Sequence, residues 1–134
     1  MGLRIYLDSC IVIYLVEEHP DYAPRLEEKI SQLNDVTFLL SHLTELECLV
    51  IPIRNKNKLL LDKFQSFFKN LRVSPLERPH FHRAANLRAK FVGLKTPDAL
   101  HLATALNLGC NEFWTNDDHL ERAAPQFARN ILRG

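Results

Sequence analysis

The chain has 134 residues and a net charge of +1, and 46% of its residues are hydrophobic. These values exclude disordered and collagen-like proteins and predict one folded domain over residues 1–134. The sequence opens without the basic and apolar segments of a secretory signal, and the apolar run at residues 10–16 is too short to span a membrane. The three cysteines form no CxxC pair, which is typical of reduced thiols. We therefore expect a cytoplasmic protein with no membrane association.

Short apolar runs alternate with helical patterns along the chain. Strands are predicted at residues 3–7, 36–40, 71–76, 112–115 and 130–132. Helices are predicted at residues 9–18, 22–33, 58–68, 79–92 and 96–108, and another begins at Ser41. Ser9 and Thr96 are the expected N-cap residues of their helices, and Gly109 ends the last one. The alternation predicts a single α/β domain with a mostly parallel central sheet of four to five strands and helices on both faces.

Acidic residues fall where predicted strands end or adjoining helices begin. Asp8 closes the first strand, Asp117 and Asp118 follow the strand at the FWT segment, and Asp98 lies in the first turn of its helix. Glu47 lies on the apolar side of another helix. Ligands of open α/β sheets bind outside the carboxyl ends of the strands, and carboxylates gathered there repel unless a cation lies among them. Oxygen ligands without a Cys or His pair indicate Mg²⁺ or Mn²⁺ rather than zinc.

Each acid taken singly has a plainer interpretation. Asp98 could cap a helix and Glu47 could be solvated, although an unpaired carboxylate on an apolar helix face would be costly. His101, three residues after Asp98, could touch the pocket, but it is expected to pack or to lie at the surface. A receiver-type phosphoacceptor domain is excluded because Asp8 has no acidic neighbour and the third strand ends without Asp. A cysteine phosphatase loop is excluded because Val16 stands where an Arg is needed.

Four segments carry a more specific pattern: IYLDSCIVIYL, LSHLTELECL, LKTPDALHLATAL and FWTNDDHL. In order and spacing they resemble the motifs of PIN-domain ribonucleases, in particular the VapC-type toxins of toxin–antitoxin systems. The catalytic and metal-binding acids that this resemblance implies are Asp8, Glu47, Asp98 and Asp117. The resemblance favours Glu47 over Glu45, which points about 200° away around the helix. It also favours Asp117 over Asp118, which stands one residue off the motif.

The resemblance implies an endoribonuclease that depends on Mg²⁺ or Mn²⁺ and hydrolyses RNA phosphodiester bonds. It further implies a cognate antitoxin protein and a homodimer as partners. Ser9 is the hydroxyl that commonly follows the first acid, and Thr115 and Asn116 are expected to orient Asp117. The alternative is a catalytically inert PIN-like module that binds RNA or protein. The presence of all four acids favours the enzyme.

Residues 54–96 hold eleven of the 17 Lys and Arg but two of the 16 Asp and Glu, a net charge of +9. Solvated helix faces explain such a segment by themselves. In a ribonuclease the same segment could bind the RNA backbone, and its candidate contacts are Arg83, Arg88 and Lys90. Five of the eight phenylalanines lie in two helical stretches, at positions 64, 67, 68, 81 and 91, and are taken here as support for a dimer.

Overall fold

The computed structural model describes residues 2–133, which form seven helices around one five-stranded sheet. The strands are β1 (Leu3–Leu7), β2 (Val36–Ser41), β3 (Arg72–Ser74), β4 (Glu112–Thr115) and β5 (Ala128–Asn130). The helices are α1 (Ser9–Val16), α2 (Tyr22–Ser31), α3 (His42–Arg54), α4 (Lys58–Lys69), α5 (Arg78–Lys90), α6 (Thr96–Asn107) and α7 (Asp118–Ala123). All strand pairs are parallel and the strand order is β3-β2-β1-β4-β5. The predicted fold class is confirmed.

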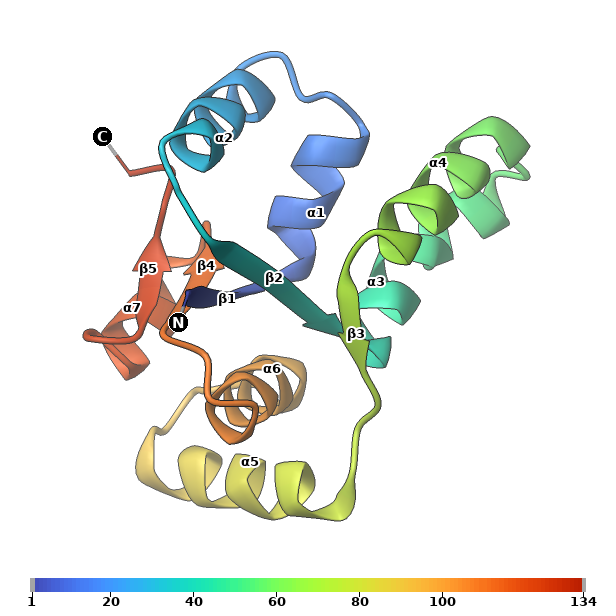
Figure 1. Ribbon diagram of the computed structural model, residues 1–134. Helices are drawn as coiled ribbons and strands as arrows, with labels where there is room; N and C mark the ends of the chain where they lie inside the picture. The colour runs from blue at the N-terminus through green and yellow to red at the C-terminus, as the bar shows by residue number, and fades with distance from the viewer. Residues whose placement is uncertain (1, 134) are drawn as a thin grey trace.

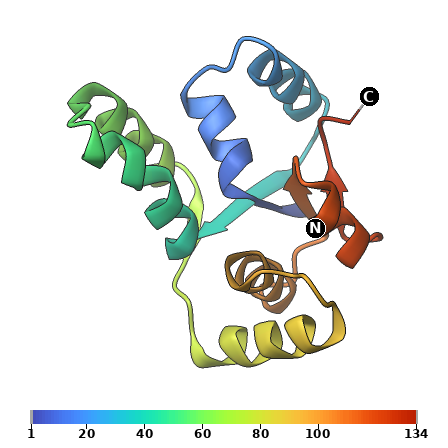
Figure 2. The same cartoon turned by 180° about the vertical axis from the view of Figure 1, so that it is seen from behind.

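Alternate residues of the central strand face opposite sides of the sheet, so each side builds its own core. Ile5 and Leu7 of β1 pack with buried residues of α1, α2 and α4. Tyr6 between them packs with buried residues of α5 and α6. Figures 1 and 2 accordingly show α5 and α6 together on one side of the sheet, with α1 to α4 on the other. Because this strand is buried on both faces, apolar and polar residues do not alternate along the segment LRIYL.

The N-cap residues predicted for two helices are wrong by one position. Asp8, not Ser9, is the N-cap of α1, and its carboxylate accepts a hydrogen bond from the Ser9 N–H. Lys95, not Thr96, is the N-cap of α6, because Lys95 keeps an extended backbone while Thr96 is already helical. Gly109 follows the end of α6 with a φ of 71°, the left-handed conformation that favours glycine.

The C-terminal region also differs from the prediction. The last strand, β5, lies at Ala128–Asn130 and therefore begins two residues earlier than the predicted strand at 130–132. Helix α7 was not predicted, because its six residues are too few for a periodic pattern. Strand β3 ends at Ser74, directly before Pro75, which has no N–H to donate to the sheet. Within residues 2–133, no helix combines the length and the apolar character that crossing a membrane requires.

Candidate active site

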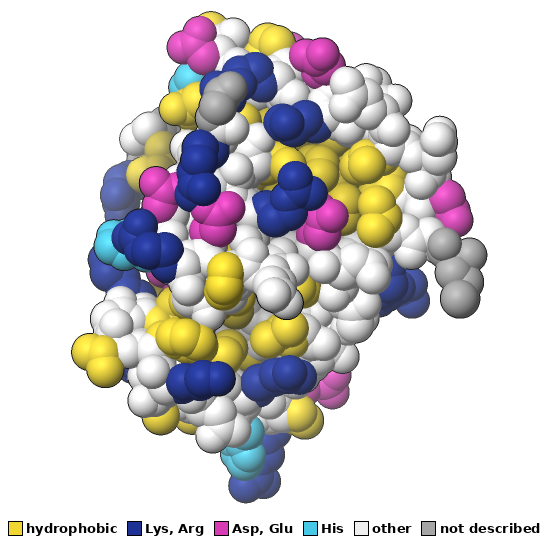
Figure 3. Space-filling model, turned by 90° about the vertical axis from the view of Figure 1, so that its left-hand side faces the viewer, with side chains coloured by type: hydrophobic (Ala, Val, Ile, Leu, Met, Phe, Trp, Pro, Cys, Tyr) yellow, Lys and Arg dark blue, Asp and Glu magenta, His cyan; other side chains and the backbone are white. Residues whose placement is uncertain are grey.

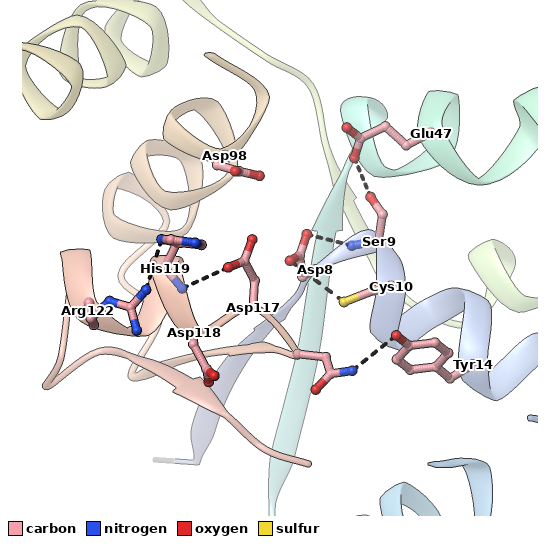
Figure 4. Close-up of a pocket in the computed structure, with 11 residues that line it drawn as sticks. Asp8, Ser9, Cys10, Tyr14, Glu47, Asp98, Asp117, Asp118, His119 and Arg122 are labelled. Carbon is pink, nitrogen blue, oxygen red and sulfur yellow. Dashed lines mark hydrogen bonds between the residues drawn. The ribbon is translucent and has the colours of Figure 1, made fainter. Parts of the chain in front are cut away.

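The carboxyl ends of β1, β2 and β4 meet at one edge of the sheet, where a pocket of about 580 Å³ opens. Its lining residues come from α1, α3, α6, α7 and the β4–α7 connection, and Figure 4 shows how they lie. They are Asp8, Ser9, Cys10, Tyr14, Glu47, Asp98, Asn116, Asp117, Asp118, His119 and Arg122. The four acids expected from the sequence are thus brought together at the edge where ligands of such sheets bind.

Asp8 is the most deeply placed of these acids, with 9% of its surface exposed. The Thr115 hydroxyl donates to Asp8 Oδ2 at 2.7 Å, and the Ser9 N–H donates to Asp8 Oδ1 at 2.9 Å. Burial raises the pKa of Asp8 above its ordinary value, although His101 and these two hydrogen bonds act in the opposite direction. Burial thus makes its negative charge costly unless a cation is nearby.

Glu47 projects from α3 into the same pocket. Its Oε1 atom accepts from the Ser9 hydroxyl and lies 2.7 Å from His101 Nε2. Burial acts to raise the pKa of Glu47, but the hydrogen bonds from His101 and Ser9 outweigh it, so the pKa is lowered. Glu45 lies outside the pocket, with His42 Nε2 3.9 Å from its carboxylate. The helix therefore has the orientation that the sequence predicted.

Asp98 lies in the first turn of α6, facing Asp8 and Asp117 across the pocket (Figure 4). Burial raises its pKa, and the negative charges of Asp8 and Asp117 raise it further. In the described part of the chain no side chain or backbone group donates a hydrogen bond to the Asp98 carboxylate. Its oxygens are therefore available to an external ligand.

Asp117 and Asp118 differ in direction although they are neighbours. Asp117 caps α7 by accepting from the His119 N–H at 2.8 Å, and its carboxylate lies beside Asp8 in Figure 4. Asp118 turns toward β5 and the C-terminal segment, where Asn130 Nδ2 and an Arg133 guanidinium nitrogen each donate to its Oδ1 at 2.7 Å. These bonds lower the pKa of Asp118. Asp117 is thus the better placed to share a ligand with Asp8 and Asp98.

The polar residues beside the acids have partners different from those expected. Thr115 Oγ1 accepts from the Asp117 N–H at 3.1 Å and donates to Asp8, so it links two of the acids. The side chain of Asn116 donates to the Tyr14 hydroxyl at 3.2 Å and makes no hydrogen bond to Asp117. Cys10 Sγ lies 3.8 Å from Asp8 Oδ2, and burial together with the Asp8 charge raises its pKa to about 12. The Cys10 thiol therefore stays protonated.

Sequence reasoning assigned no role in the site to His101. Its side chain is 1% exposed, and both ring nitrogens are within hydrogen-bonding distance of a partner. Nδ1 lies 2.7 Å from the Tyr6 hydroxyl and Nε2 lies 2.7 Å from Glu47. The available signal was its spacing of three residues from Asp98, which places both on one side of a helix.

The basic residues proposed for the RNA backbone are exposed, but two of them bond to neighbouring segments of the chain. Arg83 donates to Asn107 at 2.8 Å, and Arg88 donates to the Leu94 carbonyl and the Thr96 hydroxyl. Both therefore hold α5 against α6 and its preceding loop, and neither lines the pocket of the acids. Only Lys90 borders a cavity next to that pocket.

This second cavity, the α5–α6 groove, has a volume of about 610 Å³ and shares four residues with the first. Its lining residues are Lys90, Phe91, Val92, Gly93, Leu94, Lys95, Asp98, Asp117, His119, Arg122 and Ala123. It therefore brings the basic side chains of Lys90, Lys95 and Arg122 next to Asp98 and Asp117. Lys95 and Arg122 were not among the residues that the sequence predicted.

As the side chains stand in residues 2–133, no three His, Cys, Asp or Glu side chains are arranged so that they could hold a metal ion. The carboxylates share a pocket, and the charges of the other three raise the pKa of Asp98, but the described side chains do not converge on a single point. An ion bound there would need some of these side chains to rotate toward it.

Comparison with known proteins gives one family. The family model described as PIN domain matches residues 5–125. No curated protein matches the chain in sequence.

Solved structures share the fold at low sequence identity. VapBC2 from Rickettsia felis, bound to a DNA fragment from its promoter, is 17% identical with a TM-score of 0.78, covering 95% of this chain and 98% of that one. A toxin–antitoxin complex from Klebsiella pneumoniae is 18% identical with a TM-score of 0.77, covering 97% and 99%. VapC20 from Mycobacterium tuberculosis, described as a toxin that cleaves the sarcin–ricin loop, is 12% identical with a TM-score of 0.75, covering 90% and 95%.

Proposed function

Because the chain belongs to the PIN domain family, we propose that it is a metal-dependent endoribonuclease that acts as the toxin of a toxin–antitoxin pair. One observation carries this proposal: four carboxylates from different parts of the chain line one pocket at the carboxyl edge of the sheet. The TM-scores of 0.75 to 0.78 with toxin structures support the assignment to the toxin branch.

The proposed cofactor is Mg²⁺ or Mn²⁺, held by Asp8, Glu47, Asp98 and Asp117. The donor set fits these ions because it consists of hard carboxylate oxygens, and because the Asp98 carboxylate has no donor in the described part of the chain. When bound, such an ion activates water and neutralises phosphate charge in an in-line displacement.

The surrounding residues prepare the acids for this role. Thr115 and the Ser9 N–H fix both oxygens of Asp8. Ser9 and His101 occupy one oxygen of Glu47 and leave its Oε2 atom without a donor in the described residues. Fixed ligands lose less conformational freedom when an ion binds.

We place the RNA strand along the α5–α6 groove rather than over the whole basic segment. On the face seen in Figure 3, Lys and Arg side chains alternate with acidic and hydrophobic ones instead of forming one basic surface. Lys90, Lys95 and Arg122 line the groove that leads to Asp98. Phosphates on one side of the cleaved bond would meet these cations.

The proposed protein partners are a cognate antitoxin and a second copy of the chain. The Klebsiella pneumoniae structure is a toxin–antitoxin complex, which supports the first. The phenylalanines support the second only in part, because Phe64 and Phe68 are buried in the core while Phe81 is 48% exposed. The exposed apolar side chains of α3 and α4 give better support, since Leu46, Ile53 and Leu59 are 59%, 59% and 70% exposed.

The test is cleavage of a structured RNA such as tRNA by the purified chain. We expect cleavage with Mn²⁺ and none with EDTA. Glu47→Gln should abolish cleavage and Glu45→Gln, its matched control on the same helix, should preserve it. Binding of RNA without cleavage in either Mg²⁺ or Mn²⁺ would instead support the inert PIN-like module.

A further inference from the structure

Behind the pocket, hydrogen bonds between side chains and the backbone of α3 form a closed ring. Tyr6 on β1 is a member of this ring and is fully buried. Its hydroxyl lies 2.8 Å from Ser41 Oγ and 3.4 Å from Thr44 Oγ1. The same hydroxyl lies 2.7 Å from His101 Nδ1, and His101 Nε2 lies 2.7 Å from Glu47. The backbone of α3 closes the ring, because Ser41 caps this helix and Glu47 lies within it.

The ring joins four elements. Tyr6 belongs to β1, Ser41 is the last residue of β2 and the N-cap of α3, Glu47 lies within α3, and His101 lies within α6. Asp98 lies one turn before His101 on α6. The ring therefore connects the helix that carries Glu47 with the helix that carries Asp98.

Glu47 needs such support because the rest of its side chain is poorly restrained. It lies on a helix surface with 31% of its side chain exposed, and a glutamate in that position samples several rotamers. Among residues 2–133, only Oε1 of this side chain has hydrogen-bond partners, and these are Ser9 and His101. His101 cannot itself rotate away, because both of its ring nitrogens are engaged and its ring is buried.

We propose that His101 and Tyr6 are positioning residues of the site: Tyr6 fixes the imidazole of His101, and His101 holds Glu47 Oε1 so that Oε2 is left for the ligand. The proposal rests on the proposed metal-dependent function. A carboxylate accepts hydrogen bonds only, so Nε2 is the nitrogen that donates to Glu47. Neither residue touches the substrate or the ion, and Tyr6 does not line the pocket.

Tyr6→Phe is the sharpest variant, because it deletes one oxygen and leaves the pocket lining intact. The aromatic side chain at position 6 keeps its stacking on Phe113, where the ring centroids are 5.3 Å apart. His101→Leu is the second variant. Thr104→Val is the matched control, because Thr104 is fully buried on the same helix and its hydroxyl bonds only the Leu100 carbonyl.

Titration calorimetry with Mn²⁺ gives the first result. We expect His101→Leu to lower the affinity for Mn²⁺ about 10- to 100-fold, which is the range for residues that orient metal ligands. Tyr6→Phe should also lower this affinity. Thr104→Val should bind Mn²⁺ as the parent does, even if its melting temperature falls as far as that of Tyr6→Phe. Unchanged Mn²⁺ affinity in Tyr6→Phe would overturn the proposal.

Crystal structures of the metal-free variants give a second, independent result. In His101→Leu we expect the Glu47 side chain to lose its hydrogen bond with the Ser9 hydroxyl. In Tyr6→Phe we expect the His101 ring to rotate. An unmoved Glu47 in both variants would overturn the proposal. If the parent itself binds no Mn²⁺, the metal part of the proposed function fails, and these structures alone decide whether His101 positions Glu47.

Discussion

Asp117 and Asp118 are adjacent in sequence but are predicted to differ in effect. Asp117→Asn should abolish RNA cleavage, because it removes a charge that faces Asp8 and Asp98. The protein should stay folded, since Asn caps a helix as well as Asp does. Asp118→Asn should leave cleavage intact and weaken the contacts to Asn130 and Arg133. Cleavage assays with Mn²⁺ beside thermal unfolding check both, and equal activity of the two variants would contradict the assignment.

A charge at Asp98 is predicted to destabilise the metal-free protein. Its pKa is raised in the folded state, so the folded protein binds this proton more tightly than the unfolded chain does. The contribution of Asp98 to stability is therefore greatest at low pH and is lost as the pH rises through its folded-state pKa. Asp98→Asn should be at least as stable as the parent at pH 7 in EDTA, with an advantage that shrinks as the pH falls.

Denaturant unfolding at pH 7 and at low pH measures this difference. Mn²⁺ provides the control, because an ion at a hundredfold excess over its Kd should stabilise the parent by about 2.7 kcal/mol. Asp98→Asn should gain much less. A large loss of stability in metal-free Asp98→Asn would show that the residue is mainly a structural part of the α6 N-terminus.

At the scale of elements, the α5–α6 pair combines two kinds of basic residue. Arg88 braces the loop before α6 through Leu94 and Thr96, whereas Lys90 and Lys95 face the groove. Reversing Lys90 and Lys95 to Glu should weaken RNA binding and lower its salt dependence. Each lost phosphate contact should lower the log–log salt slope by about 0.7 for a single strand.

Filter binding over a salt series, in an Asp98→Asn background that prevents cleavage, measures this effect. Arg83→Glu is the matched control, because Arg83 lies on α5 and contacts Asn107 away from the groove. An equal loss of binding in the control would mean that net charge, and not the groove, attracts the RNA.

At the scale of the whole molecule, the exposed apolar side chains of α3 and α4 predict self-association. Sedimentation velocity at micromolar concentration should show a dimer. Leu46→Glu with Ile53→Glu should convert it to a monomer, because both side chains are 59% exposed in the isolated chain. Val92→Glu is the control, since Val92 is 99% exposed but lies in the loop between α5 and α6. A monomeric parent would contradict the prediction.

The sequence by itself determined the order of the five strands and of six of the seven described helices, and the four acids that meet in the pocket. Strand β1 ends in three apolar residues because both of its faces are buried there, and that pattern is visible in the consecutive residues Ile5, Tyr6 and Leu7. Strand ends predicted that Asp8, Glu47, Asp98 and the Asp117–Asp118 pair gather at one edge, and the resemblance to PIN-domain motifs selected Asp117 from that pair. These signals are local, so each can be identified within a short segment.

Only the tertiary structure decided which side chains hold these acids. Thr115 and Asp8 are 107 residues apart, and His101 and Glu47 are 54 residues apart. Arg83 and Arg88 lie in a basic segment typical of RNA-binding surfaces. Their side chains nevertheless form hydrogen bonds with the neighbouring helix and loop. Helical and strand periodicity reflects contacts within a few residues, whereas these partners are set by how separate elements pack against the two faces of the sheet.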